Sequence, residues 1–262
     1  MREQPPSGRW LFTRQRSLVA VSILSPLLLL GLWEAVAFAN LVDTRFFPPP
    51  SRVMGVLGNL LLSGQFLSHI AISLGRILAG YSIGVFFGIL IGVAAGISPG
   101  FRAVIGPLVT AMYSVPKTAL LPLMVLFFGF GEASKIVVLA ISAFFLTLVN
   151  TTAGVRSIAP VYFEVARNLH ASRVLLLRTV AIPGALPYII AGMKLAWGVA
   201  LLLIVVAEMT ATDGGIGYFI MASWRLFKIQ DMMAGMIVIG LIGYLSNLLF
   251  DQLAARTQAW KA

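Results

Sequence analysis

Long runs of apolar residues limit most strongly what this chain can fold into. Runs long enough to cross about 30 Å of hydrocarbon as a helix occur six times. They lie at residues 18–39, 71–97, 104–128, 133–155, 187–211 and 232–253. With 59% hydrophobic and 11% charged residues in a chain of 262, a water-soluble fold of this size could not bury so much apolar surface. The sequence therefore predicts an all-α, polytopic membrane protein with six transmembrane helices.

The first apolar run follows several arginines, as the core of a signal peptide would. It is about 20 residues long, and no cleavage site of the small-x-small type follows it. We expect a retained first transmembrane helix. The expected organisation is an N-terminal segment 1–17, a membrane domain 18–255 and a C-terminal tail 256–262.

Lysines and arginines are divided unequally between the segments that join the spans. Eleven lie on one side: Arg2, Arg9, Arg14, Arg16, Arg102, Arg156, Arg167, Arg173, Arg178, Arg256 and Lys261. Five lie on the other: Arg45, Arg52, Lys135, Arg225 and Lys228. The positive-inside rule then predicts that both termini are cytoplasmic. Because these basic residues are separated by apolar spans, with no interleaved basic and aromatic face, we expect no nucleic-acid partner.

The composition also argues against catalysis by this chain. There is no cysteine, and the two histidines, His69 and His170, lie far apart in the sequence, so no metal site is expected. Glu34, Glu208 and Asp251 each stand alone in their spans, which disfavours a membrane enzyme with paired carboxylates. The phosphate-binding Gly-x-x-x-x-Gly-Lys-Ser/Thr pattern is absent, so any ATP would be hydrolysed by a partner.

Two further patterns predict local structure. Glycine recurs every four residues from Gly80 to Gly96, which allows another helix to approach closely, either as fixed packing within the subunit or as a sliding or dimer contact. Between Asn40 and Ser68, three prolines precede an apolar stretch. We expect Ser51 to cap a helix there that lies along the outer membrane surface.

A polar segment, Arg156 to Leu186, separates the fourth and fifth runs. Pro160 suits the first position of a helix. The apolar residues Tyr162, Val165, Ala166 and Leu169 then fall on one face, while the polar residues Glu164, Arg167 and Asn168 fall on another. About three helical turns are marginal in water, so this helix is expected to rest on a partner surface.

The same segment resembles the EAA loop of binding-protein-dependent ABC importer permeases. The residues that match are Glu164-Val165-Ala166, Ala171-Ser172, Val180, Ile182-Pro183 and Ala185-Leu186-Pro187. The family pattern is Glu-Ala-Ala, a glycine four residues later, and a hydrophobic-x-Leu-Pro ending. Val165 and Ile182 depart mildly from it. His170 stands at the glycine position, where glycine permits a left-handed turn that histidine adopts at a cost.

Other motifs resemble the nitrate, sulfonate, taurine and bicarbonate branch of this family. They are Arg76-Ile77, Ala79-Gly80, Ser114-Val115-Pro116-Lys117, Leu121-Pro122-Leu123, Phe127-Phe128-Gly129, Ser134-Lys135-Ile136 and the run from Ala207-Glu208 to Tyr218. The likeness covers roughly residues 45 to 255.

The resemblance implies a type I permease of the bacterial inner membrane, without catalytic residues and without a cofactor of its own. ATP and Mg²⁺ would bind separate ATPase subunits, a soluble binding protein would deliver the solute, and a second copy of the permease would complete the path through the lipid bilayer. The implied coupling helix spans about 160–172, with Glu164, Val165, Ala166, Arg167, Leu169, His170, Ala171 and Ser172 as the residues that contact the ATPase.

Charges inside apolar spans usually face the protein interior or a water-filled path. Arg76, Lys117 and Glu208 are therefore candidate path residues, with Lys194 as a further charge inside a span. For Lys117 the alternatives are pairing with Glu208 or snorkelling, and for Glu208 a structural pairing with Arg76 or Lys117. Asp213 and the glycines after it suggest an external turn or gate.

Cations along the path favour a small anion as substrate, such as a sulfonate, nitrate or bicarbonate. Import of a vitamin precursor of the pyrimidine, thiamine or riboflavin type is the alternative within the same family. An ion-coupled secondary transporter would be expected to show internal repeats, which are not seen, and would leave the segment around Glu164 without a role.

Overall fold

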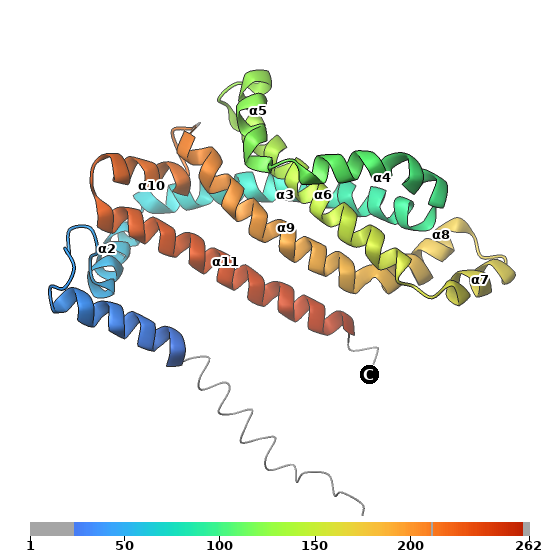
Figure 1. Cartoon of the computed structure of the whole chain (residues 1–262), viewed down its shortest axis with the longest axis horizontal. Coiled ribbons are helices and arrows are strands. Elements are labelled where there is room, and N and C mark those ends of the chain that lie inside the picture. The colour runs from blue at the N-terminus through green and yellow to red at the C-terminus, as the bar shows by residue number, and fades with distance from the viewer. Residues whose placement is uncertain (1–23, 211, 259–262) are drawn as a thin grey trace, which may run out of the picture.

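The computed structural model describes residues 24–210 and 212–258, and these residues form helices joined by turns, with no strand among them (Figure 1). The first described helix is Leu24–Phe38. It is followed by α2 (Pro50–Leu62), α3 (Gln65–Ile97), α4 (Pro99–Ser114), the short 3₁₀ turn η1 (Lys117–Ala119), α5 (Leu120–Phe128), α6 (Glu132–Arg156), α7 (Pro160–Asn168), α8 (Arg173–Leu176), the π-helical turn η2 (Leu177–Ala181), α9 (Ile182–Thr210), α10 (Ile216–Arg225) and α11 (Ile229–Gln258). The all-α prediction is confirmed.

Among the residues that the structure describes, four helical segments are long and apolar enough to cross a membrane, and they match four of the expected spans. They are Gln65–Ile97, Glu132–Arg156, Arg173–Thr210 and Ile229–Thr257. The third of these is longer than expected because α8, η2 and α9 follow one another without a break.

The expected span 104–128 is broken. Helices α4 and α5 meet at 82°, and the two count as one span only if taken together. The break falls at Val115 and Pro116, where extended backbone follows the last turn of α4 and proline has no N–H to continue it. The first expected span, 18–39, lies partly outside the described residues, and its described part is the shorter apolar helix Leu24–Phe38. The described residues therefore contain four spans, or five with the bent pair, and the count of six is not confirmed.

The glycine repeat lies along the contact between α3 and α6. A Cβ atom added at Gly84 would overlap the carbonyl oxygen of Ala140, and one at Gly92 would lie 2.7 Å from Cβ of Thr151. By contrast, Gly75 on the same helix has nothing within 4 Å of such an atom. The repeat therefore packs two helices of one subunit against each other, which supports the first of the two alternatives.

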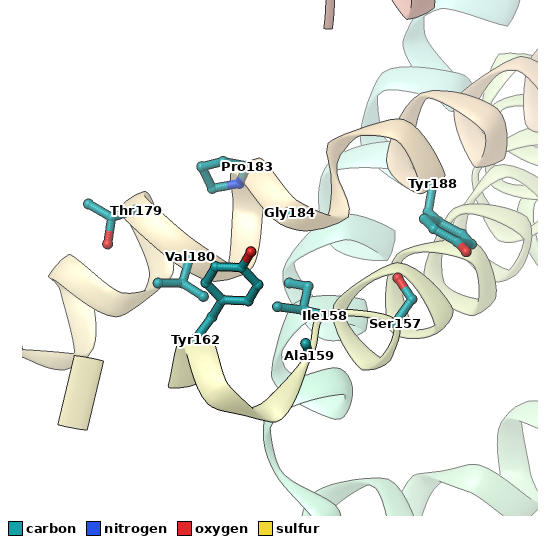
Figure 2. A pocket seen from close by; sticks show the side chains of 9 residues that line it. All are labelled: Ser157, Ile158, Ala159, Tyr162, Thr179, Val180, Pro183, Gly184 and Tyr188. Atoms are coloured by element: carbon teal, nitrogen blue, oxygen red, sulfur yellow. The ribbon is translucent and has the colours of Figure 1, made fainter. Parts of the chain in front are cut away.

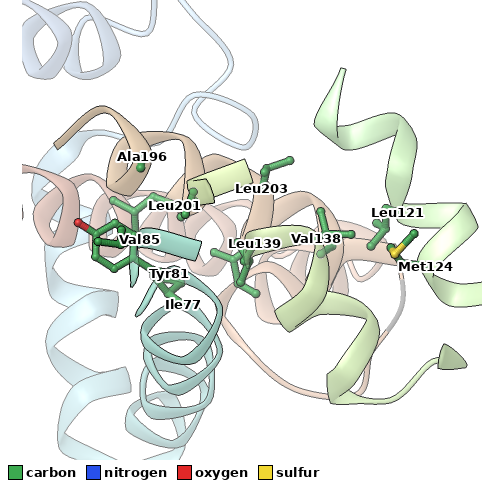
Figure 3. Packing of buried hydrophobic residues seen from close by; sticks show 14 of the residues in the cluster. Ile77, Tyr81, Val85, Leu121, Met124, Val138, Leu139, Ala196, Leu201 and Leu203 are labelled. Carbon is green, nitrogen blue, oxygen red and sulfur yellow. The ribbon is translucent and has the colours of Figure 1, made fainter. Parts of the chain in front are cut away.

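The main apolar core is built where α3, α6 and α9 meet, with α5 packed on one side (Figure 3). A second apolar core packs α2, α10 and α11 together at one end of the bundle. In it, Val53 and Leu57 of α2 pack with Ile216 and Ile220 of α10 and with Ala234 of α11. Helix α2 is thus attached to the bundle by its apolar face.

The expected cap of α2 was wrong. The helix begins at Pro50, and the N-cap residue Pro49 makes no side-chain hydrogen bond. The carboxylate of Glu34 caps the helix from outside, because Ser51 donates its backbone N–H and its hydroxyl to the two Glu34 oxygens over 3.0 and 2.6 Å. An acceptor from the preceding helix replaces the local one.

The two ends of the bundle carry different elements. Figure 1 shows α7 and α8 at one end and α2 and α10 at the other. Arg102, Arg156 and Arg167 border a single cavity at the α7 end, whereas Arg45 and Lys228 border one at the α10 end. These five residues, three from one group of the sequence count and two from the other, therefore lie at opposite ends of the described bundle.

Candidate functional site

Helix α7 forms with Pro160 at its first position, as expected. Tyr162, Val165 and Leu169 are exposed, while Ala166 is buried. The prediction of Ala166 on one apolar face with the other three is therefore only partly right. Ala166 is turned inward because Phe163, one turn earlier, packs on the core formed by Val93, Val155, Ala185 and Ile189. The apolar residues of α7 thus divide into an anchoring set and an exposed set.

The end of α7 is a left-handed turn at His170. Its φ is +50°. The N–H of Ala171 donates to the carbonyl of Ala166, and that of His170 donates to the carbonyl of Arg167, both over 2.9 Å. This pair of hydrogen bonds defines a Schellman motif with His170 at the position that usually holds glycine. The turn expected from the glycine position is present, and histidine occupies it.

A second turn of helix starts directly after the Schellman motif. Ser172 caps α8 by accepting a hydrogen bond from the N–H of Leu175 over 3.2 Å. The chain then passes through the π-helical turn η2 into α9. Pro183 lies in the first turn of α9 and lacks the N–H that would bond the carbonyl four residues earlier, so the wider turn occurs where the regular ladder is already interrupted.

Cavities border α7 on two sides. One of about 630 Å³ lies between Tyr162, Ile158 and the residues Thr179, Val180 and Pro183, as Figure 2 shows. The other, of about 280 Å³, is bordered by Glu164 and Arg167 together with Arg102 and Arg156. The ion pairs among the described residues include neither Glu164 nor Arg167. These two side chains therefore keep their charges available at the end of the bundle.

At the opposite end, Arg76 forms the centre of a buried charge network. Its side chain is 6% exposed. It donates to Glu132 through Nε and Nη2, to Glu208 and Gly214 through Nη1, and to Thr212 through Nη2. All five N–H groups of the guanidinium are used in this way.

Glu208 ties the turn before α10 to α3. Its carboxylate is fully buried and accepts hydrogen bonds from Arg76, from the Ser73 hydroxyl and from the N–H of Gly217. Gly215 has φ +111°, and a Cβ there would overlap the Glu208 carboxylate. The expected turn is present at the start of α10, a helix that the apolar runs do not predict, and a hydrogen bond from Gly217 ties it to Glu208.

Lys117 lies at the break between α4 and α5. Its ammonium donates to the carbonyls of Met112, Tyr113 and Val115 over 2.7 to 3.0 Å. Those carbonyls belong to the last turn of α4 and to the extended residue after it, so Lys117 provides a cation where the helix dipole is negative. Pairing of Lys117 with Glu208, one of the alternatives, does not occur.

Other charges inside the spans also have partners. Lys194 of α9 pairs with Asp251 of α11 over 2.5 Å. Lys135 of α6 is 1% exposed and donates to the carbonyls of Phe130 and Gly131 over 2.8 and 3.0 Å. Sequence reasoning places Lys135 only among the external charges and gives Glu132 and Ser73 no site, although Lys135 stands in one of the branch motifs. Among the described residues no group of three or more potential metal ligands occurs.

Comparison with known proteins matches this architecture. Residues 84–259 match the family described as the binding-protein-dependent transport system inner membrane component. The chain is 35% identical over 257 residues to a taurine transport system permease protein of Escherichia coli, covering 96% of this chain and 92% of that protein. It is 32% identical over 239 residues to a putative aliphatic sulfonates transport permease protein of Bacillus subtilis, covering 91% and 87%.

Two solved structures share the fold. One is an inward-facing methionine ABC transporter, with a TM-score of 0.59 and 19% identity over 73% of this chain and 97% of that one. The other is an amino acid ABC transporter, with a TM-score of 0.58 and 19% identity over 76% and 95%.

Proposed function

The chain belongs to the family of binding-protein-dependent transport system inner membrane components, and from this premise we propose that it forms a translocation path for small sulfonates across the bacterial inner membrane. It is the permease subunit of an ATP-driven importer, an integral membrane protein, and ATP hydrolysis resides in a separate subunit. Family membership also sets aside the ion-coupled secondary transporter.

Helix α7 is the proposed contact with the ATPase. Its exposed apolar residues supply area to bury, while Glu164 and Arg167 border a cavity and remain outside the ion pairs of the described chain. Phe163 joins α7 to the core of α6 and α9, and Ala166 is buried. A push on the exposed face would therefore reach two spans, and this division of α7 is the observation that carries the proposal. It assigns the coupling role to Glu164, Val165, Ala166, Arg167, Leu169, His170, Ala171 and Ser172.

The path itself is proposed to run beside α4 and α5, between this subunit and a second copy. No residue of α4 is buried within the subunit. Irregular backbone at membrane depth is stable only where protein covers it or water fills a path. The break at Pro116 and Lys117 is such a segment, so a second copy and an aqueous path are the surroundings that satisfy it. The bundle end with α7 and the C-terminus of α11 is then cytoplasmic, in agreement with the charge distribution.

Sulfonates are the proposed substrates because the relatives are described as taurine or aliphatic sulfonate permeases. A soluble binding protein would deliver them at the α10 end. A vitamin precursor is the alternative substrate class. Uptake of labelled taurine, reduced by unlabelled sulfonates but not by a vitamin precursor, distinguishes the two classes.

The coupling role is tested by co-purification of the permease with its ATPase. The triple variant Glu164→Lys, Val165→Gln and Leu169→Gln should lose the ATPase, because it reverses one charge and removes the exposed apolar contacts. The matched control is Leu226→Gln, which makes the same apolar-to-amide change at an exposed residue of the opposite end. Leu226→Gln should retain the ATPase, and undiminished assembly of the triple variant would refute the role of α7.

A further inference from the structure

Beside the Arg76 network lies an open cavity of about 590 Å³, within the range of small-molecule sites. Arg76, Glu132, Lys135, Thr210, Thr212 and Asp213 are among the residues that border it. It lies at the α10 end of the bundle, where α6 begins and α9 ends. This is the end at which the proposed function has the solute arrive.

The cations expected to meet an anion are occupied. All five N–H groups of Arg76 have acceptors, and the three ammonium hydrogens of Lys117 match the three carbonyls around it. Neither has a donor left for a ligand. The candidates chosen from the sequence therefore serve the fold.

Lys135 differs from both. Its ammonium has three hydrogens but two acceptors within the described chain, the carbonyls of Phe130 and Gly131. It is 1% exposed, and the ion pairs among the described residues do not include it. A buried cation without a carboxylate partner is costly unless another anion is provided. The cavity wall therefore contains one cation that an oxyanion would complete.

The remaining charges restrict which oxyanion fits. Glu132 on the cavity rim is 58% exposed, and Asp213 is exposed with no ion pair among the described residues. With Glu208 behind Arg76, three carboxylates surround two cations. A simple anion would be repelled by this net negative charge, whereas a zwitterion brings no net charge and places its ammonium near the rim carboxylates.

We propose that this cavity is a binding site for a small amino-sulfonate, with the sulfonate at Lys135 and the ammonium at Asp213 and Glu132. The proposal rests on the proposed function, since it places the substrate within the permease. It adds a site at which the permease itself distinguishes zwitterionic from simple sulfonates after release by the binding protein.

The test uses the absence of cysteine in the chain. Thr210→Cys places a reporter thiol on the cavity wall, where the hydroxyl bonds only within its own helix. The assembled permease–ATPase complex in lipid nanodiscs is treated with a methanethiosulfonate reagent. The reagent is neutral, because a charged one would be attracted to the cavity differently in variants that change a charge there. Taurine should slow modification of the reporter thiol, and ethanesulfonate, which lacks the ammonium, should need a roughly tenfold higher concentration.

Two variants in the reporter background assign the contacts. Lys135→Met should raise the protecting taurine concentration roughly tenfold or more, while Lys135→Arg should restore protection. Lys228→Met is the control, since it removes an exposed ammonium at the same end of the bundle that lies outside the cavity. Asp213→Asn should reduce the difference between the protecting concentrations of taurine and ethanesulfonate. This variant tests the proposal even if Lys135→Met fails to assemble, because an unchanged difference would contradict the ammonium contact.

Three results would overturn the proposal: a thiol that is not modified at all, modification unaffected by taurine, or equal protection in Lys135→Met. ATP hydrolysis stimulated by the taurine-loaded binding protein is measured in the same complex. Stimulated hydrolysis without protection of the thiol would reject the site and leave the proposed function standing. Protection of the thiol without stimulated hydrolysis or uptake would support the site and reject the proposed function.

Discussion

His170 occupies a backbone conformation that most side chains avoid. Its φ of +50° is required for the two hydrogen bonds that close α7. A left-handed conformation costs a residue with a Cβ about 1 kcal/mol relative to glycine. The exact direction of the chain between α7 and α8 therefore depends on one residue that carries a small, local strain.

His170→Gly should therefore stabilise the turn. The expected gain is at most about 1 kcal/mol, because glycine also gains freedom in the unfolded chain. Thermal unfolding of the purified permease measures it. His170→Val is the control, since a β-branched residue at this φ should lower the midpoint. A lower midpoint for His170→Gly than for His170→Val would show that the histidine side chain has another role.

Arg76 and Glu208 form the most buried ion pair of the described chain. Arg76→Met leaves the Glu208 carboxylate without its cation in a buried place, and such single removals cost about 3–5 kcal/mol. The double variant Arg76→Met and Glu208→Met removes both charges and should recover part of that loss. The unfolding midpoints of Arg76→Met, Glu208→Met, the double variant and the unchanged protein form a double-mutant cycle. Additive losses would contradict the pairing.

At the scale of helices, α3 and α6 approach each other closely because glycines replace side chains along their contact. Gly84→Ala would drive a methyl group into the carbonyl oxygen of Ala140. The helices would have to separate, at a cost of about 1–3 kcal/mol.

The matched control for Gly84→Ala is Gly75→Ala on the same helix, where nothing lies within 4 Å. It should leave the unfolding midpoint unchanged or raise it, since alanine favours helix over glycine by up to about 1 kcal/mol. Equal midpoints for the two variants would mean that the helices can move apart freely, and the packing role of the repeat would then be wrong.

At the scale of the whole molecule, α5, the second half of the bent pair, projects from the bundle in Figure 1. Leu126 on α5 is 77% exposed. If a second copy covers this side, Leu126→Cys should form a disulfide between two subunits in membranes treated with a mild oxidant. The chain has no cysteine of its own, so any crosslink comes from the introduced thiol.

Leu249→Cys on α11 is the control for this crosslink, because Leu249 is also exposed on an unbroken span. Gel electrophoresis without reductant distinguishes dimer from monomer. A crosslink from Leu249→Cys alone would place the second copy elsewhere, and none from either would favour a homologous rather than identical partner.

The sequence by itself determined the class of fold, the position of four spans and the segment around Glu164. Apolar runs of this length have one stable solution in a bilayer, and a proline start, an amphipathic period and a left-handed position at residue 170 are local properties of the backbone. These features depend only on residues that are close together in the chain, so the sequence is sufficient to predict them.

Only the tertiary structure decided which charges meet. Arg76, Glu132 and Glu208 come from three different helices. Glu34 caps α2 although it lies 17 residues before Ser51 in the chain. Ala166 is buried because Phe163 packs against the core next to α7. Lys117 and Lys135 look equivalent as lysines in or near apolar runs, yet one has all its hydrogens bonded and the other has one to spare. Hydrogen-bond satisfaction is a property of atoms brought together from distant positions, so no local pattern along the chain encodes it.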